Sequence, residues 1–233
     1  MNTGQIMIKA LLAPLPLAGL ALGPLASSSI AQPLPQTDAA DDAAATREIY
    51  IAPLQPINDD LTEQIPLGLV SIIILDDEMR MYVMAEGLPA GIPHLQHYHG
   101  FIDGAEATCP TAEADINNDG VVDLIETQPA AGQTLVPIHD APASLEGLLA
   151  IERFPTASEP DGVIDYRGTV SLQALESALQ SQHGIGELDL QNRVVFIHGV
   201  GEGANIPDSA ESIADVPASV TLPIACGEFT RVD

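Results

Sequence analysis

The chain contains no tryptophan and only four phenylalanines and four tyrosines, so its core must be built from valine, isoleucine, leucine and alanine. Basic residues are also scarce, because 7 Lys and Arg stand against 33 Asp and Glu, for a net charge of −26. Such an acidic surface repels nucleic acid and anionic lipid headgroups, which excludes binding to either. It favours cations, solubility and a saline or extracytoplasmic habitat.

The first 31 residues have the pattern of a targeting segment. Lys9, the one lysine of the chain, precedes an apolar stretch over residues 10–26, and small residues lead up to Ala31. This order predicts a signal peptide over residues 1–31 that is cleaved after Ala31. Three prolines interrupt the stretch and argue against a membrane span. We therefore expect an exported protein, periplasmic or extracellular, with no membrane contact after cleavage.

The next segment, residues 32–46, is rich in alanine, aspartate, proline and glutamine and shows no periodicity. This composition predicts a disordered acidic leader. The remaining residues, 47–233, have the length of one domain.

Cysteine occurs twice, at Cys109 and Cys226. Two cysteines in an exported chain predict one disulfide. Such a bridge closes a loop of more than a hundred residues and, on the chain-entropy model, contributes about 4–5 kcal/mol. Two free thiols that bind a metal are the alternative, which the compartment disfavours.

The domain contains many short segments of strand length separated by glycine, proline and aspartate, a pattern that predicts a β-sandwich or barrel. A single helix is expected over residues 172–181, where Ser171 can cap the start and Gly184 follows the end. Pro223 indicates an edge strand or a bulge in the last segment. Besides a short strand that carries two histidines, the expected strands are residues 48–54, 67–75, 79–85, 134–138, 163–172, 193–198 and 220–229.

That strand contains His97 and His99, which follow a glycine-rich turn at residues 87–91. Residues two apart on a strand point to the same face, so these imidazoles can bind one ion together. His198 ends a later apolar segment and can supply a third nitrogen from a neighbouring strand. Imidazole ligands suit copper and zinc, so we predict a site for one of these metals.

A fourth ligand has two candidates in the sequence. His94 lies three residues before His97 in an irregular segment, where it can either assist the metal or serve as a surface or supporting group. His139, which follows the first cysteine and precedes the late strands, is the downstream candidate.

Residues 115–126 match the twelve-residue calcium loop of EF-hands at each key position. Gly120 stands at the sharp turn, and Pro129 is expected to cut the exiting helix short. We predict a lone calcium loop of structural role, with an unliganded acidic turn as the alternative. The expected ligands are Asp115, Asn117, Asp119, the carbonyl of Val121, Asp123 and Glu126.

The order of these pieces resembles the copper–zinc superoxide dismutase family. The resemblance runs over residues 67–229 and uses five motifs, each weak alone. They are the Gly87-Leu88…Gly91 turn, the His97-x-His99 pair, Cys109, His198 at the end of a late strand, and Ala225-Cys226-Gly227. A chordin-type domain is the nearest competing family.

The resemblance implies an all-β fold, a Greek-key β-barrel or sandwich of superoxide dismutase type with an inserted calcium loop and one short helix. It implies copper at His97, His99 and His198, a disulfide between Cys109 and Cys226, and superoxide as substrate. The calcium loop stands where the family has its zinc-binding loop.

Three departures bear on the activity. The histidine and aspartate cluster of the family's zinc site is missing, Pro223 stands where the family has a substrate-guiding arginine, and the charge repels an anion such as superoxide. The sequence thus predicts an exported copper-binding β-barrel, for which superoxide dismutation by a copper-only enzyme stays open. The alternatives are a non-catalytic chordin-like metal carrier and a calcium-stabilised structural module. It leaves open the native metal, the fourth ligand and the oligomeric state.

Overall fold

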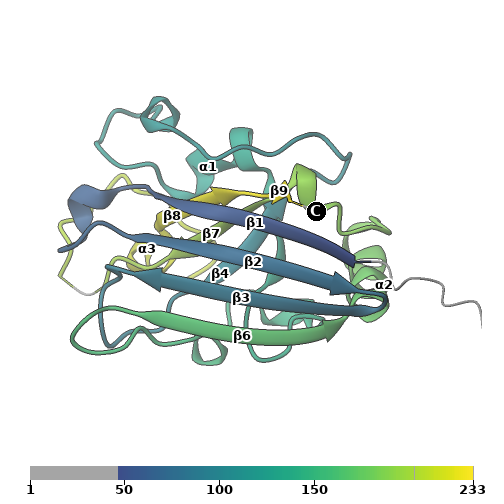
Figure 1. The fold of residues 1–233 in the computed structure, drawn as a ribbon. Coiled ribbons are helices and arrows are strands. Elements are labelled where there is room, and N and C mark those ends of the chain that lie inside the picture. Colours follow the sequence, from purple (N-terminus) through teal and green to yellow (C-terminus); the bar gives the residue numbers. More distant parts are fainter. Residues whose placement is uncertain (1–46, 202, 233) are drawn as a thin grey trace, which may run out of the picture. The chain divides into compact units, whose positions relative to one another are not determined.

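The computed structural model describes residues 47–201 and 203–232, so the predicted signal peptide and leader lie outside the described residues. The described part is built mainly of antiparallel strands (Figure 1). In this part the nine strands are β1 (Arg47–Pro56), β2 (Leu67–Leu75), β3 (Glu78–Glu86), β4 (Gln96–Gly100), β5 (Gln133–Pro137), β6 (Ile164–Ser171), β7 (Val194–His198), β8 (Pro223–Glu228) and β9 (Thr230–Arg231).

Strand β3 shows why these segments become strands. Met79, Met81 and Val83 are fully buried, whereas Arg80 and Met84 between and after them are exposed. Only a period of two separates the two sets, and that is the period of a strand. β3 pairs with β2 along its whole length across the tight Asp76-Asp77 turn.

The strands form two sheets that share β1, in the order β5-β4-β7-β8-β1-β2-β3-β6, and β9 adds to β1. We call β1, β2, β3 and β6 sheet A, and β5, β4, β7, β8 and the end of β1 sheet B. Because β1 belongs to both, the sheets curl into a barrel that stays open between β5 and β6 in the described residues. The prediction of an all-β barrel or sandwich is confirmed.

The main core fills the space between the two sheets. Its residues include Val70 and Ile72 from β2, Tyr98 from β4 and Val195 and Ile197 from β7. Fully burying one such aliphatic side chain stabilises a fold by about 1.5–3 kcal/mol.

A second, smaller cluster lies on the opposite face of sheet B. It contains Val194 and Phe196 of β7, Cys226 of β8, and Ala107 and Val122 from the segment that follows β4. Loops therefore cover the outer face of sheet B, and β4 and β7 are buried on both faces. The predicted metal ligands of β4 and β7 belong to this covered face.

The helices differ in part from expectation. α2 (Leu172–His183) confirms the predicted helix and extends it by two residues, with Ser171 accepting a hydrogen bond as its N-cap. α1 (Leu124–Ala131) is the short exiting helix of the calcium pattern, and the single turn α3 (Ala218–Thr221) was not expected. Short 3-10 turns occur at Asp59–Leu61, Ala112–Ala114, Leu145–Gly147, Ile151–Arg153 and Leu190–Asn192.

α1 forms because Asp123 and Glu126 make a capping box at its start. The Asp123 side chain accepts from the backbone N–H of Glu126, and the Glu126 side chain accepts from the N–H of Asp123. Pro129 lies inside the helix and removes one backbone donor, and the helix ends two residues later.

Pro223 begins β8 at an irregularity of the ladder. The register shifts between Ile197 and His198, and Pro223 is the partner of His198. β8 lies between β7 and β1, so of the two expected alternatives the bulge is confirmed and the edge strand is wrong. The bulge comes directly before the last residue of β7.

A disulfide joins Cys109 to Cys226 across 117 residues, as the resemblance implies. It ties the loop that follows β4 to the centre of sheet B, where Cys226 is fully buried beside Phe196. Among the described residues, none of the helices has the length and apolarity that crossing a membrane requires.

Replacing both cysteines by alanine is expected to lower the free energy of unfolding by about 4 kcal/mol, because the long loop is no longer closed in the unfolded chain. Urea denaturation of the two proteins measures the loss. A difference within the error of the extrapolated free energies would contradict this view of the bridge.

Candidate metal centre

The pairing of β4 with β7 positions three histidines on one face. His97 lies opposite Phe196, His99 lies opposite Val194, and His198 ends β7. The backbone N–H of His198 donates to the carbonyl of Leu95 at 2.9 Å, which continues this pairing past the strand end. Alternation on two adjacent strands therefore turns all three imidazoles toward the covered side of sheet B.

The three rings form a compact triangle. The ring centroids are 6.1 Å apart for His97 and His99, 5.5 Å for His97 and His198, and 5.7 Å for His99 and His198. One nitrogen from each ring lies within 4.8 Å of the other two. We call these residues the histidine triad, and their arrangement can hold a metal ion.

Each triad residue keeps one buried ring nitrogen without a hydrogen-bond partner. These are Nδ1 of His97, Nδ1 of His99 and Nε2 of His198. An unpaired buried nitrogen costs free energy unless a ligand satisfies it, so these three nitrogens are available to hold a metal ion.

The second nitrogen of two triad residues is fixed by a backbone carbonyl. His97 Nε2 lies 2.7 Å from the carbonyl of Leu148, and His198 Nδ1 lies 2.8 Å from the carbonyl of Thr221. A carbonyl only accepts, so these nitrogens carry the protons. The tautomers that result leave the lone pairs of His97 Nδ1 and His198 Nε2 free to bind a cation.

His99 is held by its neighbours on sheet B. Its Nε2 lies 3.2 Å from the hydroxyl of Thr134 on β5, and its ring packs against Phe196 with centroids 4.7 Å apart. Phe196 also contacts the ring of His198. One aromatic side chain thus sets the orientation of two triad residues.

The triad is buried and uncharged. Burial lowers the pKa of His97 to about 3 and of His198 to about 4, and it lowers the pKa of His99 well below its usual value. The neighbouring imidazoles lower the pKa of His97 and His99 further, because each disfavours a positive charge on the other. At neutral pH the site therefore offers three neutral nitrogen donors.

Two hollows adjoin the triad. One of about 100 Å³ borders His97 and His198, and one of about 380 Å³ borders His99 and also His183 at the end of α2. Leu124, Thr134 and Ile213 line both hollows. The hollow beside His97 and His198 is thus lined mainly by apolar side chains, and the hollow beside His99 also has polar side chains near His183.

The structure does not bring His94 into the triad. Its Nδ1 lies 2.9 Å from the carbonyl of His198, and its Nε2 lies 2.9 Å from the carbonyl of Pro89. Each ring nitrogen therefore faces a backbone carbonyl and not the triad. His94 thus links the turn before β4 to the end of β7 and contacts the backbone of the triad residue His198.

His139, the other candidate for a fourth ligand, is also outside the triad. Its ring and that of His97 both make T-shaped contacts with Phe154, with centroids 5.1 and 5.2 Å from it. His139 Nδ1 accepts the N–H of Ala141, and its buried Nε2 has no partner. Phe154 is thus the contact that the imidazoles of His139 and His97 share.

The acidic loop, residues 115–126, is folded by its own side chains. The carboxylate of Asp115 accepts the N–H groups of Asp119 and Gly120, and Glu126 accepts those of Ile116 and Asn117. Within residues 47–201 and 203–232, the triad is the one group of three or more histidine, cysteine or acidic residues whose ligand atoms lie within 4.8 Å of one another. The loop carboxylates are therefore not gathered to that distance.

The acidic loop also binds the segment that covers the triad. Asp123 accepts the N–H of Glu211 at 2.7 Å, and Asp119 accepts the hydroxyl of Ser209 at 2.6 Å. Leu124 follows Asp123 directly and lines both hollows. The acidic loop is thus linked to the two hollows through Leu124 and through its hydrogen bonds to the segment that contains Ser209 and Glu211.

Sequence reasoning missed the groups that surround the triad. The carbonyls of Leu148 and Thr221 and the hydroxyl of Thr134 come from segments with no distinctive motif. The capping box was readable as Asp123-x-x-Glu126, but the calcium pattern contains the same two positions.

No protein-family model and no curated protein matches this chain.

The stability of the metal-free protein is expected to fall on acidification from pH 7.5 to pH 5. In the unfolded chain the triad histidines titrate near pH 6.5, whereas in the folded chain their pKa values are depressed. Below about pH 6.5 the unfolded state therefore binds protons that the folded state does not, and the free energy of unfolding decreases.

Urea midpoints of the metal-free protein at several pH values test this dependence. The His97→Asn variant removes one titrating group and is expected to show a shallower dependence. Equal midpoints of the wild-type protein at pH 7.5 and pH 5 would exclude buried neutral imidazoles.

Proposed function

We propose that this chain is an exported copper-binding protein of the kind that the copper–zinc superoxide dismutase family represents. The observation that carries the proposal is the convergence of three unpaired, buried imidazole nitrogens from His97, His99 and His198. Three neutral nitrogen donors suit copper, with zinc as the other candidate. The disulfide is compatible with export.

The chain's own residues prepare the site for such an ion. The carbonyls of Leu148 and Thr221 fix the tautomers of His97 and His198, and Phe196 orients His99. Because the imidazoles are already neutral at pH 7, the ion does not have to displace protons from them.

Superoxide dismutation is the activity that the resemblance favours. Bound copper would supply the one-electron couple through which one superoxide is oxidised to dioxygen and another, with two protons, is reduced to hydrogen peroxide. The protein would contribute the three ligands and the hollow that borders His97 and His198, through which a small molecule can reach them.

A copper carrier without turnover is the second candidate, and Pro223 favours it. The residue is buried at the start of β8, and its carbonyl accepts a hydrogen bond from Asn58. It presents no positive charge to the triad, and the acidic surface slows the approach of an anion.

The purified protein is expected to bind one copper ion, because the triad offers one set of three nitrogens. Elemental analysis after dialysis gives the stoichiometry. His97→Ala and His99→Ala are expected to abolish binding, whereas His183→Ala, which removes a histidine outside the triad, is expected to preserve it.

Copper retained equally by the triad variants and by His183→Ala would refute the site. Superoxide consumption by the copper-loaded protein then separates the two candidate functions. A rate above that of the His99→Ala variant supports the enzyme, and a rate equal to it supports the carrier.

We also propose that the acidic loop binds calcium in a structural role. The support is the match of Asp115, Asn117, Asp119, Asp123 and Glu126 to the ligand positions, with Val121 contributing its carbonyl. Gly120 adopts the positive φ of 94° that the sharp turn at the sixth position needs.

Calcium is expected to raise the melting temperature of the protein, and the calcium-dependent part of the rise should disappear in the Asp115→Asn variant. Glu113→Gln, an acidic residue just outside the pattern, serves as the matched control and should keep the rise. Differential scanning calorimetry with calcium and with chelator makes the comparison, and identical curves in both conditions would show that the loop binds no calcium.

A further inference from the structure

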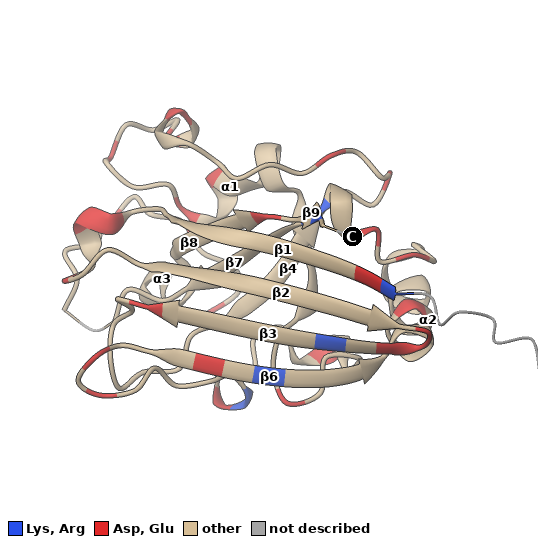
Figure 2. Cartoon of the chain, viewed as in Figure 1, with Lys and Arg blue, Asp and Glu red and all other residues tan. Residues whose placement is uncertain are grey.

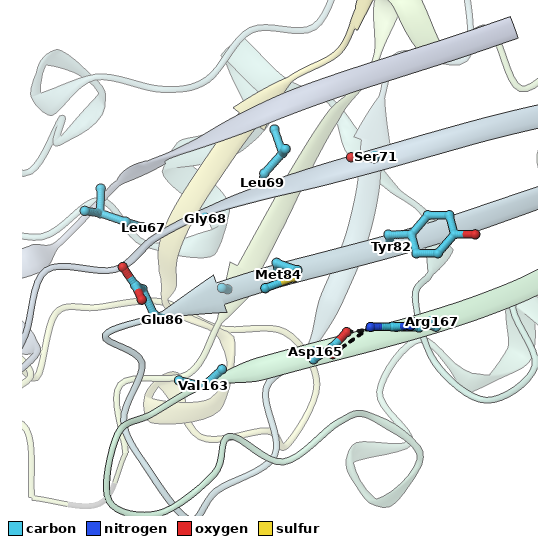
Figure 3. Close-up of a pocket in the computed structure, with 11 residues that line it drawn as sticks. Leu67, Gly68, Leu69, Ser71, Tyr82, Met84, Glu86, Val163, Asp165 and Arg167 are labelled. Atoms are coloured by element: carbon cyan, nitrogen blue, oxygen red, sulfur yellow. Dashed lines mark hydrogen bonds and ion pairs between the residues drawn. The ribbon is translucent and has the colours of Figure 1, made fainter.

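The outward face of sheet A carries an unusual concentration of exposed apolar side chains. Leu67 and Leu69 on β2 and Met84 on β3 are 47%, 40% and 56% exposed, and Ile65 just before β2 is 57% exposed. Leu67, Leu69 and Met84 line a groove of about 520 Å³ over β2, β3 and the start of β6 (Figure 3). We call this surface the outer face of sheet A.

The strand register makes these residues one continuous patch. Leu69 is the direct partner of Pro53 on β1 and of Met84 on β3. Further along the same strands, Ile73 is the partner of Ile49. β2 thus has apolar residues on both of its faces, although the loops of the described residues cover the outer face of sheet B and leave that of sheet A exposed. A strand that is apolar on both faces is typical of one buried on both faces.

The charges on this face nearly cancel. Arg80 is paired with Glu78 at 2.6 Å, and Arg167 is paired with Asp165 at 3.1 Å. Figure 2 shows these arginines as blue bands on β3 and β6, while acidic residues dominate the loops. A balanced face is exceptional in a chain whose net charge is −26.

The charge distribution determines which occupant suits the face. A basic partner would be drawn to the acidic loops instead, and an anionic lipid surface would be repelled by the chain as a whole. Two copies of this chain repel each other least where their charges cancel.

A two-fold axis through the face would bring the same surface of both copies together. The Asp165-Arg167 pair of one copy can then lie antiparallel to that of the other, so that each arginine meets a carboxylate. Ile65, which is exposed beside the groove and does not line it, is available to enter the groove of the second copy.

We propose that the outer face of sheet A is the interface of a two-fold symmetric homodimer. The triad lies on the covered face of sheet B, so the dimer leaves it free, and the proposal does not depend on metal binding. Because each copy is strongly acidic, screening by salt should strengthen the association.

Sedimentation velocity of the full chain over a range of micromolar concentrations tests the proposal. We expect a concentration-dependent shift from monomer to dimer that moves to lower concentration when salt is raised. Leu69→Lys and Met84→Lys, each made alone at an exposed position, are expected to weaken the dimer by about tenfold or more.

Ile102→Lys is the matched control, because Ile102 is 53% exposed but lies in the loop after β4. It should dimerise like the wild-type chain. Circular dichroism establishes that all variants are folded. A monomer at every concentration, or equal weakening by Ile102→Lys and Leu69→Lys, would overturn the proposal and assign the face to another partner.

Discussion

The antiparallel pairing of β4 with β7 is the constraint on which the candidate site depends. It sets His97 and His99 beside His198, which is about a hundred residues away in the sequence. Both strands are buried on both faces, so a slip of one residue would move apolar core residues outward and turn the imidazoles into the core. The same burial that fixes the register keeps the imidazoles uncharged.

Sequence patterns predicted the parts of the structure that depend on local periodicity. The alternation in β3 and the His-x-His spacing were readable because the side-chain period of a strand is two, and β2 was readable as a short apolar run rich in β-branched residues. The surroundings of the triad were not readable. Leu148 and Thr221 contribute backbone carbonyls, and a carbonyl is common to every residue, so nothing in the sequence marks these two.

The acidic loop shows how one pattern can serve two structural roles. Asp123 and Glu126 match calcium positions nine and twelve, yet here they cap α1, and Asp123 also holds the segment around Glu211. Position twelve of a calcium loop and position N3 of a capped helix both favour glutamate, for different physical reasons. The sequence alone could not separate these roles because both require a carboxylate at the same spacing.

The bridge between Cys109 and Cys226 has a consequence for the resistance of the protein to proteolysis. It encloses the loops that carry Leu148 and Ile213 together with β5, β6 and β7. A protease that cuts the backbone once in any of these exposed connections would leave both fragments covalently attached. The nicked protein would remain a single molecule, with its histidine-bearing strands still paired.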